Sequence, residues 1–270
     1  MTRRALLLAV VMATAVFVAR TDGPPKTALV ALVNAHAHND YEHPRPLLDA
    51  LDHGFCSVEA DVFLVNGDLL VAHDADHERA DHTLEALYLD PLRERVWRND
   101  GHLYPQGPHC TLLIDVKSQA EATYAALRDV LGRYADILTR FRGDAVDQRA
   151  LTVIVSGNRA RATMAAEAVR YAAVDGTLAD LDSGAPLALV PWISADWQKF
   201  FTWSGSGAMP TNDERLLRSI VNRAHAQGRK VRFWNAPDSP LSWTVLLGAG
   251  VDLINTDDLA GLERLLRGTH

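Results

Sequence analysis

The sequence predicts a closed (β/α)₈ barrel, an α/β fold in which eight parallel strands alternate with helices. After the first twenty residues, apolar runs of strand length alternate with segments whose apolar residues recur every three or four positions. The apolar runs are continuous rather than alternating in polarity, as strands buried on both faces are. No Pro/Ser-rich linker or block of charge divides the remainder. We therefore expect residues 27–270 to form one domain, a TIM barrel.

The strands and helices follow from these patterns in chain order. The predicted strands lie at 29–37, 56–65, 110–117, 151–156, 171–174, 187–193, 230–235 and 251–256. The clearest predicted helices lie at 119–140, 158–170, 213–227 and 259–267. Asn66-Gly67 separates two short apolar runs and predicts a tight hairpin after the second strand.

Residues 175–212 show little helical periodicity, and Ser-Gly-Ser-Gly occupies 204–207. This composition favours an irregular loop or a lid. Five aromatic residues in this part of the chain supply either a surface for a lipid or a sugar or a hydrophobic plug over the barrel: Trp192, Trp197, Phe200, Phe201 and Trp203.

The first twenty residues have the pattern of a secretory signal segment. Arg3 and Arg4 precede an apolar run at 5–19 that only Thr14 interrupts. An uncleaved membrane anchor is the alternative, but this run is shorter than the ~20 residues that cross a bilayer. We expect residues 1–20 to be removed and the mature protein to be secreted. The removed segment carries three arginines and no acid, so the mature chain is more acidic.

Composition excludes several classes of protein. The chain of 270 residues has 27 Lys+Arg against 34 Asp+Glu and a net charge of -7, which argues against a nucleic-acid coat. Its two cysteines form no Cys-x-x-Cys, so a thiolate zinc site is excluded. Cys56 and Cys110 lie near the starts of neighbouring predicted strands. They either pair in an exported protein or remain two buried thiols.

Polar clusters end several predicted strands, where the active sites of such barrels form. His36 and His38 end the first strand and are followed by Asn39. The later clusters are Glu59 with Asp61 on the second strand, His73 after the hairpin, Asp115 with Lys117 on the third, and Trp234 on the seventh. Because side chains two residues apart share a face of a strand, each such pair points the same way.

Three of these side chains predict a metal site. Glu59, Asp61 and Asp115 would repel one another in a poorly hydrated barrel mouth unless a cation lay between them. Carboxylate oxygens prefer hard ions, so one Mg²⁺ or Ca²⁺ is expected, with positions left open for water or substrate.

The other side chains complete a chemistry suited to a phosphodiester. Two histidines on different loops can accept and donate protons near neutral pH. The cation and Lys117 would take up the charge of the non-bridging oxygens. The sequence thus favours a metal-dependent hydrolase acting on a small-molecule or lipid phosphodiester, with peripheral membrane contact if the substrate is a lipid. The oligomeric state is not predicted.

Two other functions are considered. An amidohydrolase-type barrel would also use His-x-His at the end of its first strand, but it needs histidines at the ends of strands five and six. No histidine occurs between His109 and His225, which argues against it. A non-catalytic exported barrel that binds phospholipid headgroups or phosphosugars would keep the same pocket, and metal-dependent turnover distinguishes it from an enzyme.

The sequence resembles the superfamily of phosphatidylinositol-specific phospholipase C and glycerophosphodiester phosphodiesterase barrels. It most resembles the branch of the altered-inheritance-of-mitochondria phosphodiesterase-like proteins. The residues that carry the resemblance are His-Ala-His-Asn-Asp-Tyr at 36–41, Glu-Ala-Asp at 59–61, His-Asp at 73–74, Asp-Val-Lys at 115–117, Arg-Phe-Trp at 232–234 and the run 250–257. They extend over nearly the whole mature chain.

The resemblance implies a role for each of these residues. His36 and His73 would be the catalytic pair, and Glu59, Asp61 and Asp115 would hold one Mg²⁺ or Ca²⁺. Substrate contacts would come from His38, Asn39, Lys117 and Trp234.

The chain also departs from the glycerophosphodiesterases. Those enzymes follow their first histidine with Arg-Gly and later carry Pro-Glu-Asn, whereas this chain has Ala37 and Pro44-Arg45-Pro46. The departure leaves the natural substrate open, and it leaves open whether His36 or His38 takes the proton. We favour His36, because spider-toxin phospholipase D barrels have a similar Ala-His-x-x-Asn around their catalytic histidine.

Overall fold

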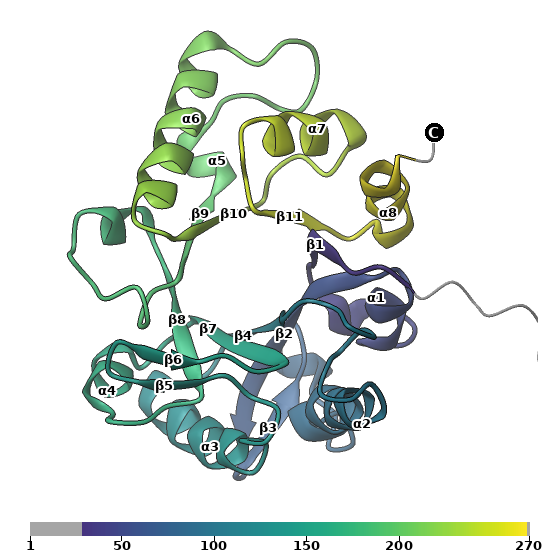
Figure 1. The fold of residues 1–270 in the computed structure, drawn as a ribbon, viewed down its shortest axis with the longest axis vertical. Helices are drawn as coiled ribbons and strands as arrows, with labels where there is room; N and C mark the ends of the chain where they lie inside the picture. Colours follow the sequence, from purple (N-terminus) through teal and green to yellow (C-terminus); the bar gives the residue numbers. More distant parts are fainter. Residues whose placement is uncertain (1–28, 269–270) are drawn as a thin grey trace, which may run out of the picture.

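The computed structural model describes residues 29–268, and its strands form the predicted barrel. Eight strands follow one another around the ring in chain order, each parallel to its neighbours, and β1 pairs with both β2 and β11 (Figure 1). They are β1 (Leu32–Ala37), β2 (Phe55–Val65), β4 (Cys110–Val116), β7 (Leu151–Gly157), β8 (Ala172–Gly176), β9 (Trp192–Asp196), β10 (Lys230–Trp234) and β11 (Leu253–Thr256).

Helices surround this ring (Figure 1). They are α1 (Leu48–Asp52), α2 (Asp90–Arg98), α3 (Ala120–Gly132), α4 (Arg161–Ala166), α5 (Trp197–Phe200), α6 (Thr211–Ala226), α7 (Pro240–Gly248) and α8 (Leu259–Arg267). Short 3₁₀ turns occupy Asp40–Glu42, Ala75–His77 and Leu178–Leu181, and a π-helical turn, Glu85–Leu89, leads into α2. The main apolar core lies between the strands and these helices.

The inside of the barrel is divided into an apolar layer and a polar layer. Leu113, Ile154, Ala173, Trp192 and Leu253 belong to a buried cluster separate from the main core, and they lie at the start or in the middle of their strands. Two residues further along the same strands stand Asp115, Ser156, Asp175, Ser194 and Asn255. Because side chains alternate with a period of two, each polar residue lies on the same face as the apolar residue before it. The apolar layer therefore closes the amino-terminal end, and the polar layer faces the opposite end.

The predicted hairpin after the second strand is confirmed. β3 (Asp68–Val71) pairs antiparallel with the end of β2, and Val65 lies opposite Asp68. Asn66 and Gly67 both have positive φ, at 52° and 98°, as the two-residue turn of a tight hairpin requires. The hairpin brings the chain back towards the barrel mouth at His73.

Three predicted elements have clearly wrong boundaries. The helix predicted at 158–170 covers only Arg161–Ala166. The helix predicted at 119–140 ends at Gly132, and β5 (Arg140–Arg142) then pairs with β6 (Ala145–Asp147). Ile137 and Leu138 have helical spacing, but they are buried from a series of turns. The strand predicted at 187–193 begins only at Trp192. The prolines at 186 and 191 lack an N–H for a strand ladder, and the residues between them form a turn.

Cys56 and Cys110 form a disulfide at the starts of β2 and β4. Of the two possibilities left open by the sequence, pairing is the one found. The bond joins two neighbouring strands at the amino-terminal end of the barrel, away from the polar layer.

The aromatic residues of the segment 192–203 have different surroundings. Trp197 stacks on Phe201 with ring centroids 4.0 Å apart, and both contact Phe233 of β10 edge-on. Trp203 is also buried. Phe200 is 44% exposed at the barrel mouth, so it is free to meet a ligand.

Between residues 29 and 268, the structure contains no helix that is both long and apolar enough to span a membrane. The predicted secretory segment, 1–20, lies outside the described residues, so its role and the export of the protein stay predictions.

Candidate active site

A cavity of about 680 Å³ opens at the carboxyl-terminal ends of the strands. Seven of the nine predicted site residues line it: His38, Asn39, Glu59, His73, Asp115, Lys117 and Trp234. A larger cavity, about 790 Å³, lies at the amino-terminal ends and includes none of them. Because function in such barrels resides at the carboxyl-terminal face, the smaller cavity is the candidate active site.

The three predicted acidic residues lie together at the base of this cavity. Asp61 on β2 pairs in register with Asp115 on β4, and Glu59 lies two residues before Asp61 on the same face. One oxygen from each carboxylate lies within 4.8 Å of the other two. The trio therefore offers three hard oxygen ligands to one ion.

The residues present fit a divalent cation. Within residues 29–268, Asp61 Oδ1 and Asp115 Oδ1 are buried and have no hydrogen-bond partner. Buried carboxylate oxygens normally have a partner, so these two atoms are suited to an ion. Burial, followed by the charge of Glu59, raises the pKa of Asp61 to about 6. A bound cation would oppose this effect.

Lys117 follows β4 and partly neutralises the acidic trio. Its Nζ lies 2.9 Å from Asp61 Oδ2 and 3.0 Å from Asp115 Oδ2. Burial alone would lower the pKa of Lys117, but the two carboxylates outweigh burial and raise it. Lys117 therefore keeps its positive charge at the cavity wall.

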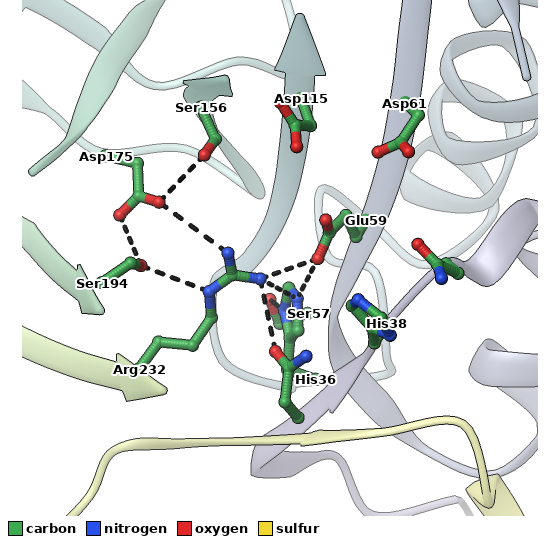
Figure 2. A network of polar contacts seen from close by, with 12 residues as sticks. His36, His38, Ser57, Glu59, Asp61, Asp115, Ser156, Asp175, Ser194 and Arg232 are labelled. Carbon is green, nitrogen blue, oxygen red and sulfur yellow. Dashed lines mark hydrogen bonds and ion pairs between the residues drawn. The ribbon is translucent and has the colours of Figure 1, made fainter. Parts of the chain in front are cut away.

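His36 does not line the cavity. Its side chain is fully buried, with Nδ1 2.7 Å from Ser57 Oγ and Nε2 3.0 Å from Glu59 Oε2 (Figure 2). Arg232 Nη1 lies 2.9 Å from the same Nε2. Burial lowers the pKa of His36 to about 4. A neutral imidazole enclosed on both nitrogens supports Glu59 from below but has no route to a substrate.

His38, two residues further along the chain, reaches the cavity. Its Nδ1 lies 2.9 Å from Asp257 Oδ1, beyond the end of β11. Burial would lower the pKa of His38, but the hydrogen bond to Asp257 and the charge of Glu59 raise it. Because a carboxylate can only accept, Nδ1 carries the hydrogen. In the described chain no hydrogen bond reaches Nε2 of His38.

His73 lies on the other side of the acidic trio, where the hairpin returns. Its Nδ1 lies 2.9 Å from the Tyr41 hydroxyl and 3.7 Å from Asp61 Oδ2. The same hydroxyl donates to Asp61 Oδ2 at 2.7 Å, so it accepts the hydrogen of His73 Nδ1. This arrangement leaves Nε2 of His73 free of partners among residues 29–268.

Trp234 and Asn39 form parts of the cavity wall. Trp234 ends β10 and is half-buried, and Lys199 Nζ lies 5.9 Å from the centre of its ring. Asn39 has a left-handed backbone, with φ at 44°, and its Oδ1 lies 2.9 Å from the Tyr41 hydroxyl. That backbone conformation turns the chain away from β1 immediately after His38.

Several side chains of the site receive no role from sequence patterns. Tyr41 and Asp257 each hold the Nδ1 of a cavity histidine, Arg232 binds Glu59, and Arg159 and Lys199 line the wall. Asp257 and Arg232 each follow or end an apolar run, which is the signal that could have drawn attention to them. Arg159 comes from the loop after β7 and Lys199 from the four-residue helix α5, and neither segment is long enough for periodicity to carry information.

Comparison with known proteins finds related domains and relatives. The AIM6-like phosphodiesterase domain matches residues 26–175, and the Glycerophosphoryl diester phosphodiesterase family matches residues 230–260. Altered inheritance of mitochondria protein 6 from Eremothecium gossypii is 30% identical over 86% of this chain and 69% of its own length. The Lachancea thermotolerans protein of the same name is 30% identical over 85% of this chain and 65% of its own length. This chain thus spans about two thirds of each of these relatives.

Solved structures with the same fold include two bacterial glycerophosphodiester phosphodiesterases. The one from Parabacteroides distasonis has a TM-score of 0.53 at 13% identity and covers 87% of this chain and 97% of its own. The one from Agrobacterium tumefaciens has a TM-score of 0.51 at 18% identity, covering 86% and 99%. At these identities the likeness shows the fold alone. The domain match over more than half of the sequence, together with the Eremothecium relative, shows that this chain belongs to the family of AIM6-like phosphodiesterase domains.

Proposed function

We propose that this protein is a metal-dependent phosphoric diester hydrolase. The observation that carries the proposal is that two carboxylates, a lysine and two partly free imidazoles border one cavity, with the third carboxylate, Asp61, buried beside them. The carboxylates can share one ion, and the imidazoles of His38 and His73 line the same space. This combination suits a reaction that must stabilise negative charge on a phosphate and transfer two protons.

Glu59, Asp61 and Asp115 would hold the cation. A divalent ion, when bound, supplies positive charge to the non-bridging oxygens of the phosphate. Lys117 acts in the same direction from the cavity wall. Arg159, which lines the cavity and makes no side-chain hydrogen bond or ion pair within residues 29–268, adds a further positive charge for the anionic substrate.

His38 takes the acid-base role that the sequence analysis assigned to His36. His38 lines the cavity with Nε2 free, whereas His36 is enclosed beneath Glu59. The raised pKa of His38 favours its protonated form, so it suits the group that protonates the leaving alcohol. His73, held at Nδ1 by Tyr41, would accept the proton of the attacking oxygen through Nε2.

The wall of the cavity suits a small-molecule or lipid phosphodiester. Trp234 and the exposed Phe200 offer apolar surface for the body of the substrate, beside the cationic Lys199. A lipid substrate would bring this rim into peripheral contact with a membrane surface. The attacking oxygen is either water or a neighbouring hydroxyl of the substrate, and a hydroxyl would form a cyclic phosphate first.

The decisive experiment measures cleavage of bis(p-nitrophenyl) phosphate with Mg²⁺ or Ca²⁺ and after addition of EDTA. Turnover is expected only with the ion. His38→Ala and His73→Ala should each lower it by about 10²–10⁴-fold with little change in Tm, because their side chains are partly exposed. His77→Ala, an exposed histidine outside the cavity, is the control.

His36→Ala should behave differently, since it removes a fully buried side chain and lowers Tm. Near-normal turnover in both His38→Ala and His73→Ala would overturn the assignment. Ligand binding without turnover would instead identify a receptor barrel. A panel of glycerophosphodiesters, phosphatidylinositol, lysophospholipids and sphingomyelin, with products identified by mass, then separates hydrolysis from cyclisation.

A further inference from the structure

Among residues 29–268, Arg232 is one of three almost completely buried arginines, and it alone of the three meets carboxylates. Arg170, Arg229 and Arg232 are 3%, 4% and 3% exposed. Arg170 and Arg229 donate to backbone carbonyl groups. Arg232 extends from β10 into the barrel and donates from Nη1 to Glu59 Oε2 at 2.7 Å (Figure 2). A buried guanidinium therefore lies directly beneath the acidic trio.

The opposite wall of the barrel holds this guanidinium in place. Its Nε lies 3.2 Å from Ser194 Oγ on β9, and Nη2 lies 3.8 Å from Asp175 Oδ2 on β8. Asp175 in turn accepts hydrogen bonds from Ser194 at 2.7 Å and from Ser156 at 3.1 Å. Figure 2 shows Arg232 between this group and Glu59. Because both ends are held, Glu59 Oε2 cannot leave Arg232 without breaking the network.

In the other two carboxylates of the trio, the protein likewise binds only one of the two oxygens. Asp61 Oδ2 is bound by Tyr41 and Lys117, and Asp115 Oδ2 is bound by Lys117. The opposite oxygens, Asp61 Oδ1 and Asp115 Oδ1, have no partner in the described chain. The hydrogen bonds of Glu59 also fall on one oxygen, Oε2. Each carboxylate therefore has one oxygen committed to the protein and one left for an ion.

This arrangement limits the ions that the site can take. Ca²⁺ takes 6–8 oxygen ligands at about 2.3–2.6 Å and often binds a carboxylate through both oxygens. Mg²⁺ prefers six ligands in octahedral geometry at about 2.0–2.1 Å, usually with waters among them. Three single oxygens and three open positions fit the second description.

We propose that Arg232 is a positioning residue that makes Glu59 a one-oxygen ligand and thereby makes the site prefer Mg²⁺ over Ca²⁺. The inference rests on the proposed function, because it concerns the ion of the same site. It assigns Arg232 no contact with the substrate. Without the guanidinium, only the neutral His36 remains on Oε2, so Glu59 can turn both oxygens towards the ion, and the advantage of the smaller cation disappears.

Isothermal titration with Mg²⁺ and with Ca²⁺ tests this for the full chain, Arg232→Met and Arg232→Lys. The wild type should bind Mg²⁺ more tightly than Ca²⁺. Arg232→Met should weaken Mg²⁺ binding by about 10–100-fold, the usual cost of removing a residue that orients a metal ligand, and should shift the preference to Ca²⁺. Arg232→Lys should restore part of the preference. Arg229→Met is the matched control, since it removes an equally buried arginine that touches no carboxylate.

A second measurement remains informative if Arg232→Met fails to fold. A crystal structure of the wild type with bound Mn²⁺, which shares the six-coordinate preference, should show Glu59 bound through Oε1 alone. Binding through both oxygens, tighter binding of Ca²⁺ by the wild type, or an unchanged preference in a folded Arg232→Met overturns the proposal.

Different results would overturn the proposed hydrolase activity. A wild type that prefers Mg²⁺ but cleaves no phosphodiester overturns the activity and leaves the role of Arg232 standing. A wild type that binds no divalent ion overturns the role of Arg232 together with the metal dependence of the reaction.

Discussion

Gly157 shows how closely the backbone approaches the acidic trio. It ends β7 with φ at +65°, and a Cβ atom there would lie 1.8 Å from Asp115 Oδ1 and 2.5 Å from the carbonyl oxygen of Val116. Asp115 Oδ1 is one of the two buried oxygens without a partner. Only glycine therefore leaves this oxygen in position to bind an ion.

Gly157→Ala should reduce divalent-ion affinity and turnover, because the new methyl group displaces the Asp115 carboxylate. The matched control is Gly143→Ala, where φ is +54° but no atom lies within 4 Å of the added Cβ. Both variants carry backbone strain on the order of 1 kcal/mol, and Gly157→Ala also meets the Val116 backbone, so ion affinity measured on the folded proteins is the readout that reports on Asp115. Titration calorimetry measures it, and equal affinities in the two variants would contradict the placement of Asp115.

Asp40 is a buried carboxyl that the proposed chemistry does not use. Its Oδ2 accepts hydrogen bonds from the Leu47 N–H at 2.5 Å and the Tyr88 hydroxyl at 2.9 Å. Burial raises its pKa to about 6, against the hydrogen bonds that favour the ionised form. The folded protein therefore holds this proton more tightly than the unfolded chain does.

Because the folded pKa is raised, the contribution of Asp40 to stability is present below the unfolded pKa of 3.8 and is lost as the pH rises towards 6. Asp40→Asn removes this titration. The unfolding free energy of the wild type relative to the variant should fall by about 2 kcal/mol between about pH 4 and about pH 7. Urea denaturation at several pH values measures the difference, and parallel pH profiles would argue against a raised pKa.

At the scale of elements, the two ends of the strands have different roles, because one end closes the barrel and the other forms the site. Leu113 of β4, Ile154 of β7, Ala173 of β8 and Trp192 of β9 close the barrel with apolar side chains, and the residues two positions later carry the polar layer. Stability and chemistry therefore lie at opposite ends of the same strands. Changes at the amino-terminal ends should alter stability and leave the site intact.

The disulfide between β2 and β4 tests this separation. It closes a loop with a sequence separation of 54, for which loop entropy gives a stabilisation of about 4 kcal/mol. Replacing Cys56 and Cys110 together by alanine should lower the unfolding free energy by about this amount while kcat stays near the wild-type value. Dithiothreitol should lower the Tm of the wild type and not that of the double variant. A loss of kcat matching the loss of stability would show that the two ends are coupled.

At the scale of the whole molecule, the centre of the barrel carries an excess of negative charge. Four carboxylates, from Glu59, Asp61, Asp115 and Asp175, face the two cationic side chains of Arg232 and Lys117. Among these contacting side chains the carboxylates outnumber the cations by two, and Arg159 on the cavity wall offsets part of this excess. Such clusters of like charge at functional sites lower stability until the ligand binds.

A divalent ion should therefore stabilise the entire fold. At a free concentration of about 100 times Kd, the unfolding free energy should rise by about 2.7 kcal/mol, and EDTA should reverse the effect. Asp115→Asn, which removes one charged ligand, should lose most of this response. Thermal unfolding monitored by circular dichroism measures it, and an identical rise in Asp115→Asn would place the ion elsewhere.

The sequence by itself determined the order of the eight strands, the hairpin and the acidic trio. These features follow from local patterns: continuous apolar runs, Asn66-Gly67, and polar residues that end strands. The limits of 119–140 and 187–193 could not be predicted, because turns between buried residues also satisfy an apolar period. The polar residues at the carboxyl-terminal ends of the strands could be placed on one face of the barrel, because parallel strands all end on the same side.

Only the tertiary structure decided which histidine reaches the cavity. His36 lies within β1 and His38 directly after its end, and two residues correspond to about 6.6 Å along an extended chain. This difference places His36 beneath the cavity and His38 on its wall. Which residue takes which position is settled only when the barrel closes. Arg232, 196 residues after His36, then covers one ring from below, and Asp257, 219 residues after His38, holds the other. Contacts over such separations arise from barrel closure, which no local pattern in the chain records.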